Sequence, residues 1–301
     1  MPTDDNLTAC NYAAAFIDIL GQRKELARFP RLPDTSDEKA MAEFQRVLKG
    51  TVGTADGLSK HIQSFFEAYS KNTVGSYIPE PLRAAFEQYS VMEIHFQRFS
   101  DGLFLYVPLA FDKIPVPIRG VFGLLTACGT ACLISLAAKR PVRGGIEVGW
   151  GVEYHPEELY GSVVARAYEL ESKVARYPRF VVGDQLAEYI RAAELNPAQS
   201  IPAEMGRAFA TYCRRMLTVD DDGYPIVDYL SDTFREVVGN DLTRDAIEKA
   251  YDFVLRQSIH WKEQKNTELA FRYSLLRDYF NARLPVWGIE PVAESADDAT
   301  L

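Results

Sequence analysis

The stretch YAAAFIDILG, residues 12–21, decides the fold of this 301-residue chain. It is a short apolar run that ends in a glycine, which is typical of a buried strand followed by a tight turn. One acidic residue, Asp18, lies inside the run between Ile17 and Ile19. A carboxylate in a buried strand needs a partner or a metal ion to offset its loss of water. The run therefore predicts a buried strand that contains an acid in need of a compensating partner or metal ion.

The patterns after this run predict a definite order of elements. They are helices at residues 37–48, 57–69 and 80–89, a hairpin of strands 92–99 and 103–107, a helix at 121–138, a strand at 142–148, a helix at 161–175 and a strand at 179–182. Asp101-Gly102 forms the hairpin turn, because Asp-Gly between two strand-like runs is a strong hairpin signal. This is the order of a βαββαβ core with helical additions, so the predicted fold class is α/β (α+β).

The patterns from residue 184 onward are almost wholly helical, with helices expected at about 184–195, 203–217, 226–238, 243–258 and 260–281. We expect an α/β domain over residues 1–184, a helical C-terminal region over 185–290 and a disordered acidic tail over 291–301. Proline-containing breaks at residues 196–202 place the boundary near the start of this region. The run DDDG at residues 220–223 is expected to be a turn.

Composition disfavours several classes of protein. The net charge is -9, with 42 acidic against 33 basic side chains, so a general nucleic-acid binder is disfavoured, although a nucleotide is still allowed. The four cysteines have no histidines at zinc-ligand spacing, which favours reduced thiols in the cytosol. The first residues show no secretory signal pattern. We therefore expect a cytoplasmic protein.

The uncharged run at residues 121–138 is close to the length of a bilayer span. Its Gly, Thr and Ser residues, and the strands expected on either side, favour a helix buried in an α/β layer. We predict no stable membrane span. A membrane-anchored protein is the alternative.

Asp18 and Asp101 are the strongest candidates for chemistry. In a βαββαβ sheet the hairpin lies beside the first strand, so the two carboxylates are expected to converge. Paired acids that hold two divalent ions suit phosphoryl transfer. The alternative is turn chemistry, with Asp101 as a good turn residue and Asp18 as a cap for the turn at Gly21.

Four segments in chain order resemble class III adenylate and guanylate cyclases. AAFIDILG (residues 14–21) resembles their first metal-binding strand, and RFSDG (98–102) resembles their second metal-binding hairpin. VRGGIEVG (142–149) looks like the family's Arg-x-Gly-x-x-x-Gly strand, and ELYGSVVARAYELE (158–171) looks like the segment that runs into the catalytic helix. Together they cover roughly residues 12–182.

Within that family the chain is most similar to the pyrimidine cyclases of bacterial Pycsar antiphage systems, which combine Phe-x-Asp-Ile-x-Gly, Phe-Ser-Asp, Arg-Gly-Gly and Ala-Tyr-x-Leu-Glu. The resemblance implies a homodimeric enzyme with two Mn²⁺ (or Mg²⁺) ions per site. It implies conversion of UTP to cyclic UMP, and a product that activates an effector in antiviral defence. A cytidylate cyclase acting on CTP is an alternative, as is a catalytically silent nucleotide-binding or dimerisation module.

The resemblance also assigns roles at the end of the first strand. Asp18, Asp101 and the Ile19 carbonyl would be metal ligands, since hard divalent ions accept backbone oxygen. The turn through Leu20 and Gly21 would point backbone N–H groups at the triphosphate.

Base recognition is expected from Gln97 and Glu158, which stand where adenylate cyclases have Lys and Asp. A glutamine amide both donates and accepts, so it suits uracil or cytosine, while Glu accepts from an N–H. Adenine is therefore disfavoured. Strand alternation puts Phe16 on the face of Asp18, and puts Gln97 and Phe99 on the face of Asp101. The alternative is that Gln97 and Glu158 are ordinary surface residues.

The chain departs from the family in the helix after residue 161. Purine cyclases have an Asn and an Arg there that orient the ribose and stabilise the transition state, and this chain has Ala165 and Glu169. We expect Arg166 to supply the missing cation, with Arg143 or Arg176 as alternatives.

Overall fold

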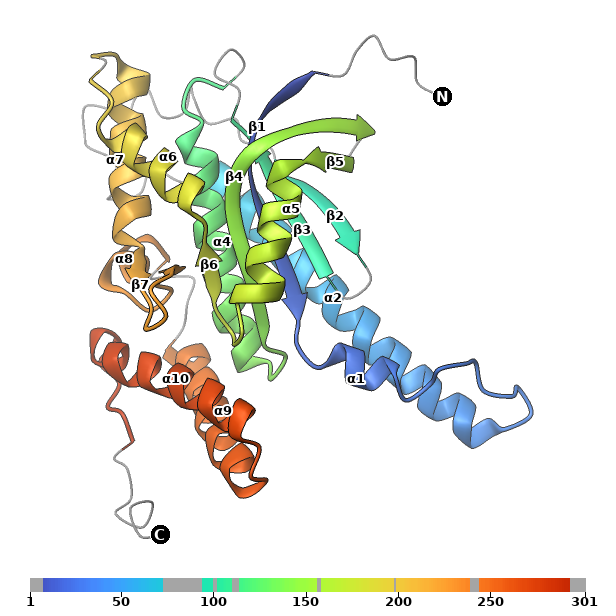
Figure 1. Ribbon diagram of the computed structural model, residues 1–301. Helices are drawn as coiled ribbons and strands as arrows, with labels where there is room; N and C mark the ends of the chain where they lie inside the picture. The colour runs from blue at the N-terminus through green and yellow to red at the C-terminus, as the bar shows by residue number, and fades with distance from the viewer. Residues whose placement is uncertain are drawn as a thin grey trace.

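The computed structural model describes residues 8–72, 94–99, 102–109, 114–155, 158–197, 199–238 and 244–292 (Figure 1). The expected helix at 80–89, the site residue Asp101, the side chain of Phe99 and nearly all of the 291–301 tail lie outside the described residues.

The elements carry the labels of Figure 1. The strands are β1 (Ala9–Ile19), β2 (His95–Phe99), β3 (Gly102–Pro108), β4 (Val142–His155), β5 (Glu158–Gly161), β6 (Phe180–Val182), β7 (Leu217–Val219) and β8 (Pro225–Val227). The helices are α1 (Gln22–Leu26), α2 (Glu38–Asn72), α4 (Ile118–Ala137), α5 (Ser162–Glu169), the π-helical turn η3 (Leu170–Val174), α6 (Asp184–Glu194), α7 (Ile201–Arg215), α8 (Asp232–Val238), α9 (Arg244–Glu263), α10 (Thr267–Arg283) and the 3₁₀ turn η4 (Leu284–Trp287).

β1 is the central strand, antiparallel to β3 on one side and to β4 on the other. Within the described residues the sheet has the order β2-β3-β1-β4-β6-β8-β7, and β5 adds to β4. Because β6 runs parallel to β4, the sheet is mixed. The fold is therefore mixed α/β, and β1, α2, β2, β3, α4 and β4 follow the predicted βαββαβ order. The hairpin β2–β3 lies beside β1, as the sequence predicted.

The two faces of the sheet are covered differently. Alternate residues of β1, including Ala13, Ala15 and Ile17, face the large core that contains α4. The residues between them, Tyr12 and Ala14, face a smaller core that contains α5. Figure 1 shows α5 in front of the sheet and α4 behind it. We call these the α5 face and the α4 face.

The apolar helix α4 is a core helix. It is long and apolar enough to cross a membrane, yet 89% of its most apolar window is buried inside the protein. It packs against the sheet and against α2, α7 and α9. Each fully buried Leu, Val or Phe side chain contributes roughly 1.5–3 kcal/mol to folding. This burial agrees with the expectation of a helix within an α/β layer.

The pair Gly144-Gly145 allows close packing on both faces of β4. A Cβ at Gly144 would lie 2.4 Å from the Phe180 ring of β6. A Cβ at Gly145 would lie 2.4 Å from the Cβ of Leu170 and 2.6 Å from the carbonyl oxygen of Ala167. Any larger side chain at residue 145 would therefore push α5 and η3 off the sheet.

The helix α2 differs from its prediction. It is one helix of 35 residues, whereas two helices with a break at residues 49–56 were expected. Gly50, Gly53 and Gly57 lie inside it, and each costs about 1 kcal/mol relative to alanine. Buried Ile62 and Phe66 join α2 to the large core, so tertiary packing offsets the weak local propensity.

The C-terminal region contributes to the sheet as well as to the helical layer. The prediction missed β7 and β8, and the helix expected at residues 226–238 begins only at Asp232. The expected turn at residues 220–223 connects these two strands. Helices α7, α9 and α10 share the large core with β1. The division at residue 184 therefore describes the sequence pattern, while the core is continuous across it.

Candidate functional site

Asp18 lies one residue before the end of β1, on the α5 face. Its cross-strand neighbours are Gly102 of β3 and Arg143 of β4. The side chain retains 25% of its exposure, so the carboxylate is half-buried rather than enclosed. Gly102 directly follows Asp101 in the chain. The described end of the hairpin is thus placed against Asp18, which is the arrangement that the βαββαβ prediction required.

Arg143 contacts three groups: the carboxylate of Asp18, the carboxylate of Glu171 in η3, and the carbonyl of Ala175, which directly follows η3. Its Nε donates a hydrogen bond of 3.2 Å to the Asp18 carboxylate, and its Nη1 donates one of 3.2 Å to the Ala175 carbonyl. Its Nη2 lies 2.8 Å from a carboxylate oxygen of Glu171. One guanidinium therefore joins the end of β1 to the covering helix.

The side chains of Asp18, Arg143 and Glu171 form a partly enclosed ionic cluster. Glu171 retains 4% of its side-chain exposure and Arg143 retains 19%. The cluster contains two carboxylates and one guanidinium, so the formal charges of its three side chains sum to one negative charge. A net negative charge at the end of a strand attracts a cation.

The oxygen donors here suit a hard divalent ion, although the described part of the chain contains one of the two expected acids. Within these residues, no group of three or more His, Cys, Asp or Glu side chains is gathered for a metal. The Asp18 carboxylate and the Ile19 carbonyl are oxygen donors of the type that Mg²⁺ and Mn²⁺ prefer. The Arg143 guanidinium on the same carboxylate is a competing cation.

The turn after β1 is tight and partly engaged. Gly21 has a φ of 91°, in the left-handed region that glycine adopts readily. The Leu20 N–H donates a hydrogen bond of 2.9 Å to the Pro141 carbonyl. A contact between that N–H and a phosphate would require the exchange of this bond. The assignment of the turn to the triphosphate remains a prediction.

Aromatic side chains line the α5 face next to Asp18. The Phe16 ring lies 5.2 Å from the Tyr168 ring of α5 and 6.1 Å from the Phe104 ring, measured between centroids. Gln97 is the cross-strand partner of Phe104, and Phe104 is the partner of Phe16, so the three share one face. This confirms that Phe16 lies on the face of Asp18, and it places Gln97 on the same face.

The Gln97 amide has an unused acceptor. Within the described residues its Oε1 is buried and has no hydrogen-bond partner. A buried carbonyl oxygen without a partner costs about 1–3 kcal/mol, unless a ligand supplies a donor.

The other predicted residues lie away from Asp18 within one chain. Glu158 pairs with His155 at the far end of β4 from Arg143 and is exposed. Arg166 is exposed, and its charge acts on Glu147 and Glu169. The Nε of Arg176 donates to the Lys173 carbonyl at 3.0 Å. Of the three candidate cations, only Arg143 contacts the Asp18 carboxylate.

Glu147 is a buried acid on the α5 face that the sequence analysis missed. Its Oε1 accepts hydrogen bonds from the backbone N–H groups of Val148, at 2.9 Å, and Leu186, at 2.8 Å. Burial raises the pKa of this carboxyl, and the two N–H groups and Arg166 partly offset the rise. Leu186 lies in the first turn of α6, so Glu147 anchors that helix to β4.

Three residues of the site were not predicted in their observed roles: Glu171, Tyr168 and Arg143 as a partner of Asp18. Tyr168 and Glu171 belong to the segment AYELE, which the family resemblance had included without assigning them a role. Their partners lie on β1 and β4, far away in the sequence, so no local pattern reveals the contacts.

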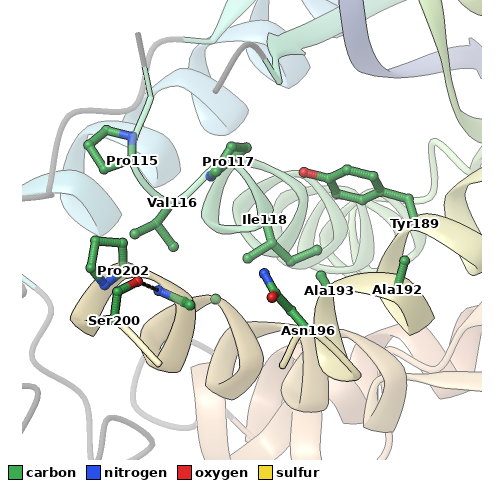
Figure 2. A pocket seen from close by; sticks show the side chains of 12 residues that line it. Pro115, Val116, Pro117, Ile118, Tyr189, Ala192, Ala193, Asn196, Ser200 and Pro202 are labelled. Carbon is green, nitrogen blue, oxygen red and sulfur yellow. Dashed lines mark hydrogen bonds between the residues drawn. The ribbon is translucent and has the colours of Figure 1, made fainter. Parts of the chain in front are cut away.

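The cavity in Figure 2 lies between the start of α4, α6 and α7. It has a volume of about 410 Å³ and a mostly apolar lining, with Ile118, Tyr189 and Pro202 on different walls. None of the residues predicted from the sequence lines it. The half-buried Asp18 carboxylate lies instead near the end of β1.

Comparison of the chain with protein-family models, with curated proteins and with solved structures found no match.

Proposed function

We propose that this protein is a class III pyrimidine nucleotide cyclase that converts UTP to 3′,5′-cyclic UMP and pyrophosphate. The observation that carries the proposal is the placement of Asp18 at the end of β1, opposite Gly102 of the hairpin. The aromatic ring of Phe16 and the amide of Gln97 lie on the same face. An acid at a strand end, a hairpin beside it, and an aromatic ring and an amide on the same face suit such a reaction.

In this proposal the ribose 3′-oxygen attacks the α-phosphorus of the substrate, the hydroxyl proton is lost and pyrophosphate leaves. Asp18, Asp101 and the Ile19 carbonyl would hold Mn²⁺ or Mg²⁺. Two such ions, when bound, lower the pKa of the attacking hydroxyl and neutralise triphosphate charge. Arg143 is the candidate cation nearest to this carboxylate. Arg166 retains its proposed role if the substrate extends along α5.

Gln97 is proposed to read the base. Its Oε1 would accept from N3–H of uracil while its Nε2 donates to O4. For cytosine, Oε1 would accept from the N4 amino group while Nε2 donates to N3. UTP is the proposed substrate, and a cytidylate cyclase that uses CTP is the alternative.

We propose that the enzyme acts as a homodimer. Trp150, Tyr154 and Tyr160 are 50%, 49% and 74% exposed on the projecting strands β4 and β5. Large aromatic side chains of this kind are enriched in protein interfaces. Within one chain Glu158 lies at the other end of β4 from Arg143. A second subunit could supply its own Glu158 to the Asp18 site of the first.

The cellular role is proposed from the resemblance alone. It is synthesis of a cyclic nucleotide in the cytoplasm during phage infection, with activation of a separate effector by the product. The rival is a cyclase-like module that binds a nucleotide without turnover. This rival is favoured by Ala165 and Glu169, which are exposed on α5 and cannot replace the family's Asn and Arg.

The test is incubation of the purified protein with each of the four NTPs and Mn²⁺, with the product identified by mass. We expect cyclic UMP, or cyclic CMP for the alternative. Asp18→Asn and Asp101→Asn should abolish it. Asp252→Asn, which removes an exposed acid paired with Arg256 on α9, is the control and should retain activity. No cyclic product from any NTP at high enzyme concentration would leave the non-catalytic module as the better description.

A further inference from the structure

The Arg143 guanidinium lies between two carboxylates of unequal exposure. Nε is 3.2 Å from Asp18, whose side chain is 25% exposed, and Nη2 is 2.8 Å from Glu171, whose side chain is 4% exposed. Attraction between charges is screened less where water is excluded. Glu171 therefore balances part of the guanidinium's charge through a close, buried ion pair, while the contact with Asp18 is also a hydrogen bond.

The ion pair between Arg143 and Glu171 matters for Asp18, because Asp18 has to bind a cation. An arginine with Asp18 as its sole counter-ion would neutralise that carboxylate and repel a divalent ion beside it. With Glu171 in place, the Arg143 charge is already balanced and Asp18 keeps its negative charge. The packing of Gly145 against the backbone of Glu171, where a Cβ would lie 2.7 Å from the Glu171 nitrogen, holds the acid at this position.

We propose that Glu171 is a positioning residue that balances the charge of Arg143 and so keeps Asp18 available to a divalent cation. The inference rests on the proposed function, because it concerns the metal affinity of the same site. Groups that support metal ligands typically change metal affinity by 10- to 100-fold when they are removed. Glu171→Gln should weaken binding because it removes the negative charge that balances Arg143.

The test is direct Mn²⁺ binding to the full chain without nucleotide, followed by the electron paramagnetic resonance signal of free Mn²⁺. Glu171→Gln should raise the Kd by about 10-fold or more. The double variant Arg143→Gln/Glu171→Gln removes both charges and should return the Kd to within about threefold of the wild type, since one negative charge again remains. A merely structural role for Glu171 would not give this rescue. Thermal unfolding of each variant checks that it is folded.

Glu169→Gln is the matched control, since Glu169 lies two residues away, is 58% exposed and pairs with Lys173. It should leave the Kd unchanged. The inference is overturned if Glu171→Gln binds Mn²⁺ like the wild type, if Glu169→Gln weakens binding equally, or if the double variant is not rescued.

Mn²⁺ binding by Asp18→Asn distinguishes failure of the proposed function from failure of the role of Glu171. If it binds Mn²⁺ as tightly as the wild type, the metal is elsewhere and both proposals fail. If it loses binding while Glu171→Gln does not, only the role of Glu171 fails.

Discussion

Gly145 lies directly beneath Glu171, so close that a Cβ at residue 145 would be 2.7 Å from the Glu171 backbone nitrogen. The strand that carries Arg143 and the helical turn that carries its counter-ion therefore meet through backbone atoms. Backbone contacts of this kind cannot move aside as a flexible side chain can. The glycine thus fixes the height of Glu171 above the sheet.

Gly145→Ala should destabilise the protein by about 1–3 kcal/mol, because the added methyl overlaps Leu170 and the backbone of Ala167. Chemical denaturation measures the loss. Gly53→Ala in α2 is the control, since nothing lies within 4 Å of a Cβ there and helix propensity favours alanine by about 1 kcal/mol. Equal stabilities for the two variants would contradict the packing of α5 on β4.

Gln97→Leu should raise KM for UTP and for CTP alike, by about 10- to 100-fold. The variant loses both hydrogen-bonding groups proposed to face the base. Steady-state kinetics with each NTP measures the change. The control is Arg98→Gln, because Arg98 contacts Asp56 and Ser59 of α2 on the opposite face. An unchanged KM in Gln97→Leu would exclude this residue from base recognition.

Trp150→Glu should convert the proposed dimer into a monomer and reduce cyclase activity in parallel. Light scattering after size exclusion gives the mass, and dilution should show that the activity follows the dimer. Leu195→Glu is the control, because Leu195 is 72% exposed and follows α6 rather than belonging to β4 or β5. A wild-type protein that is monomeric while fully active would contradict the shared site.

The free energy of unfolding should fall as the pH decreases below about 6.5, and His61 should account for part of the fall. Burial lowers the pKa of His61 in the folded state. The unfolded chain then binds more protons than the folded chain, so acid favours unfolding. Urea denaturation between pH 8 and pH 5 should show a smaller decrease for His61→Leu than for the wild type. Parallel curves would show that His61 does not contribute.

The parts of the fold with strong local signals were predictable. β1 was evident from an apolar run that ends at a glycine, and the hairpin from Asp-Gly between two alternating runs. The continuity of α2 was not predictable, because Gly50, Gly53 and Gly57 weaken its local helix propensity. Its stability comes from tertiary packing instead. β7 and β8 are three residues each, too short to show an alternating pattern, although Asp222-Gly223 between them is a hairpin signal.

The candidate site was predictable only where its residues alternate along a single strand. Alternation along β1 correctly put Phe16 and Asp18 on one face. Contacts of Arg143 with Asp18 and Glu171 join residues that are far apart in the sequence, and they depend on the register of β1 with β4. A single sequence does not reveal that register. The predicted pairing of Asp18 with Asp101 remains a prediction, since Asp101 lies outside the described residues.

The burial of α4 has a consequence for the synthesis of the chain. The helices that cover it, α7 (Ile201–Arg215) and α9 (Arg244–Glu263), are encoded well after it. While the ribosome translates that interval, the nascent polypeptide carries an uncovered apolar helix long enough to engage a membrane-targeting factor or a chaperone. We therefore expect cotranslational protection of residues 118–137 to limit the yield of soluble protein, and we expect chains truncated before α9 to aggregate.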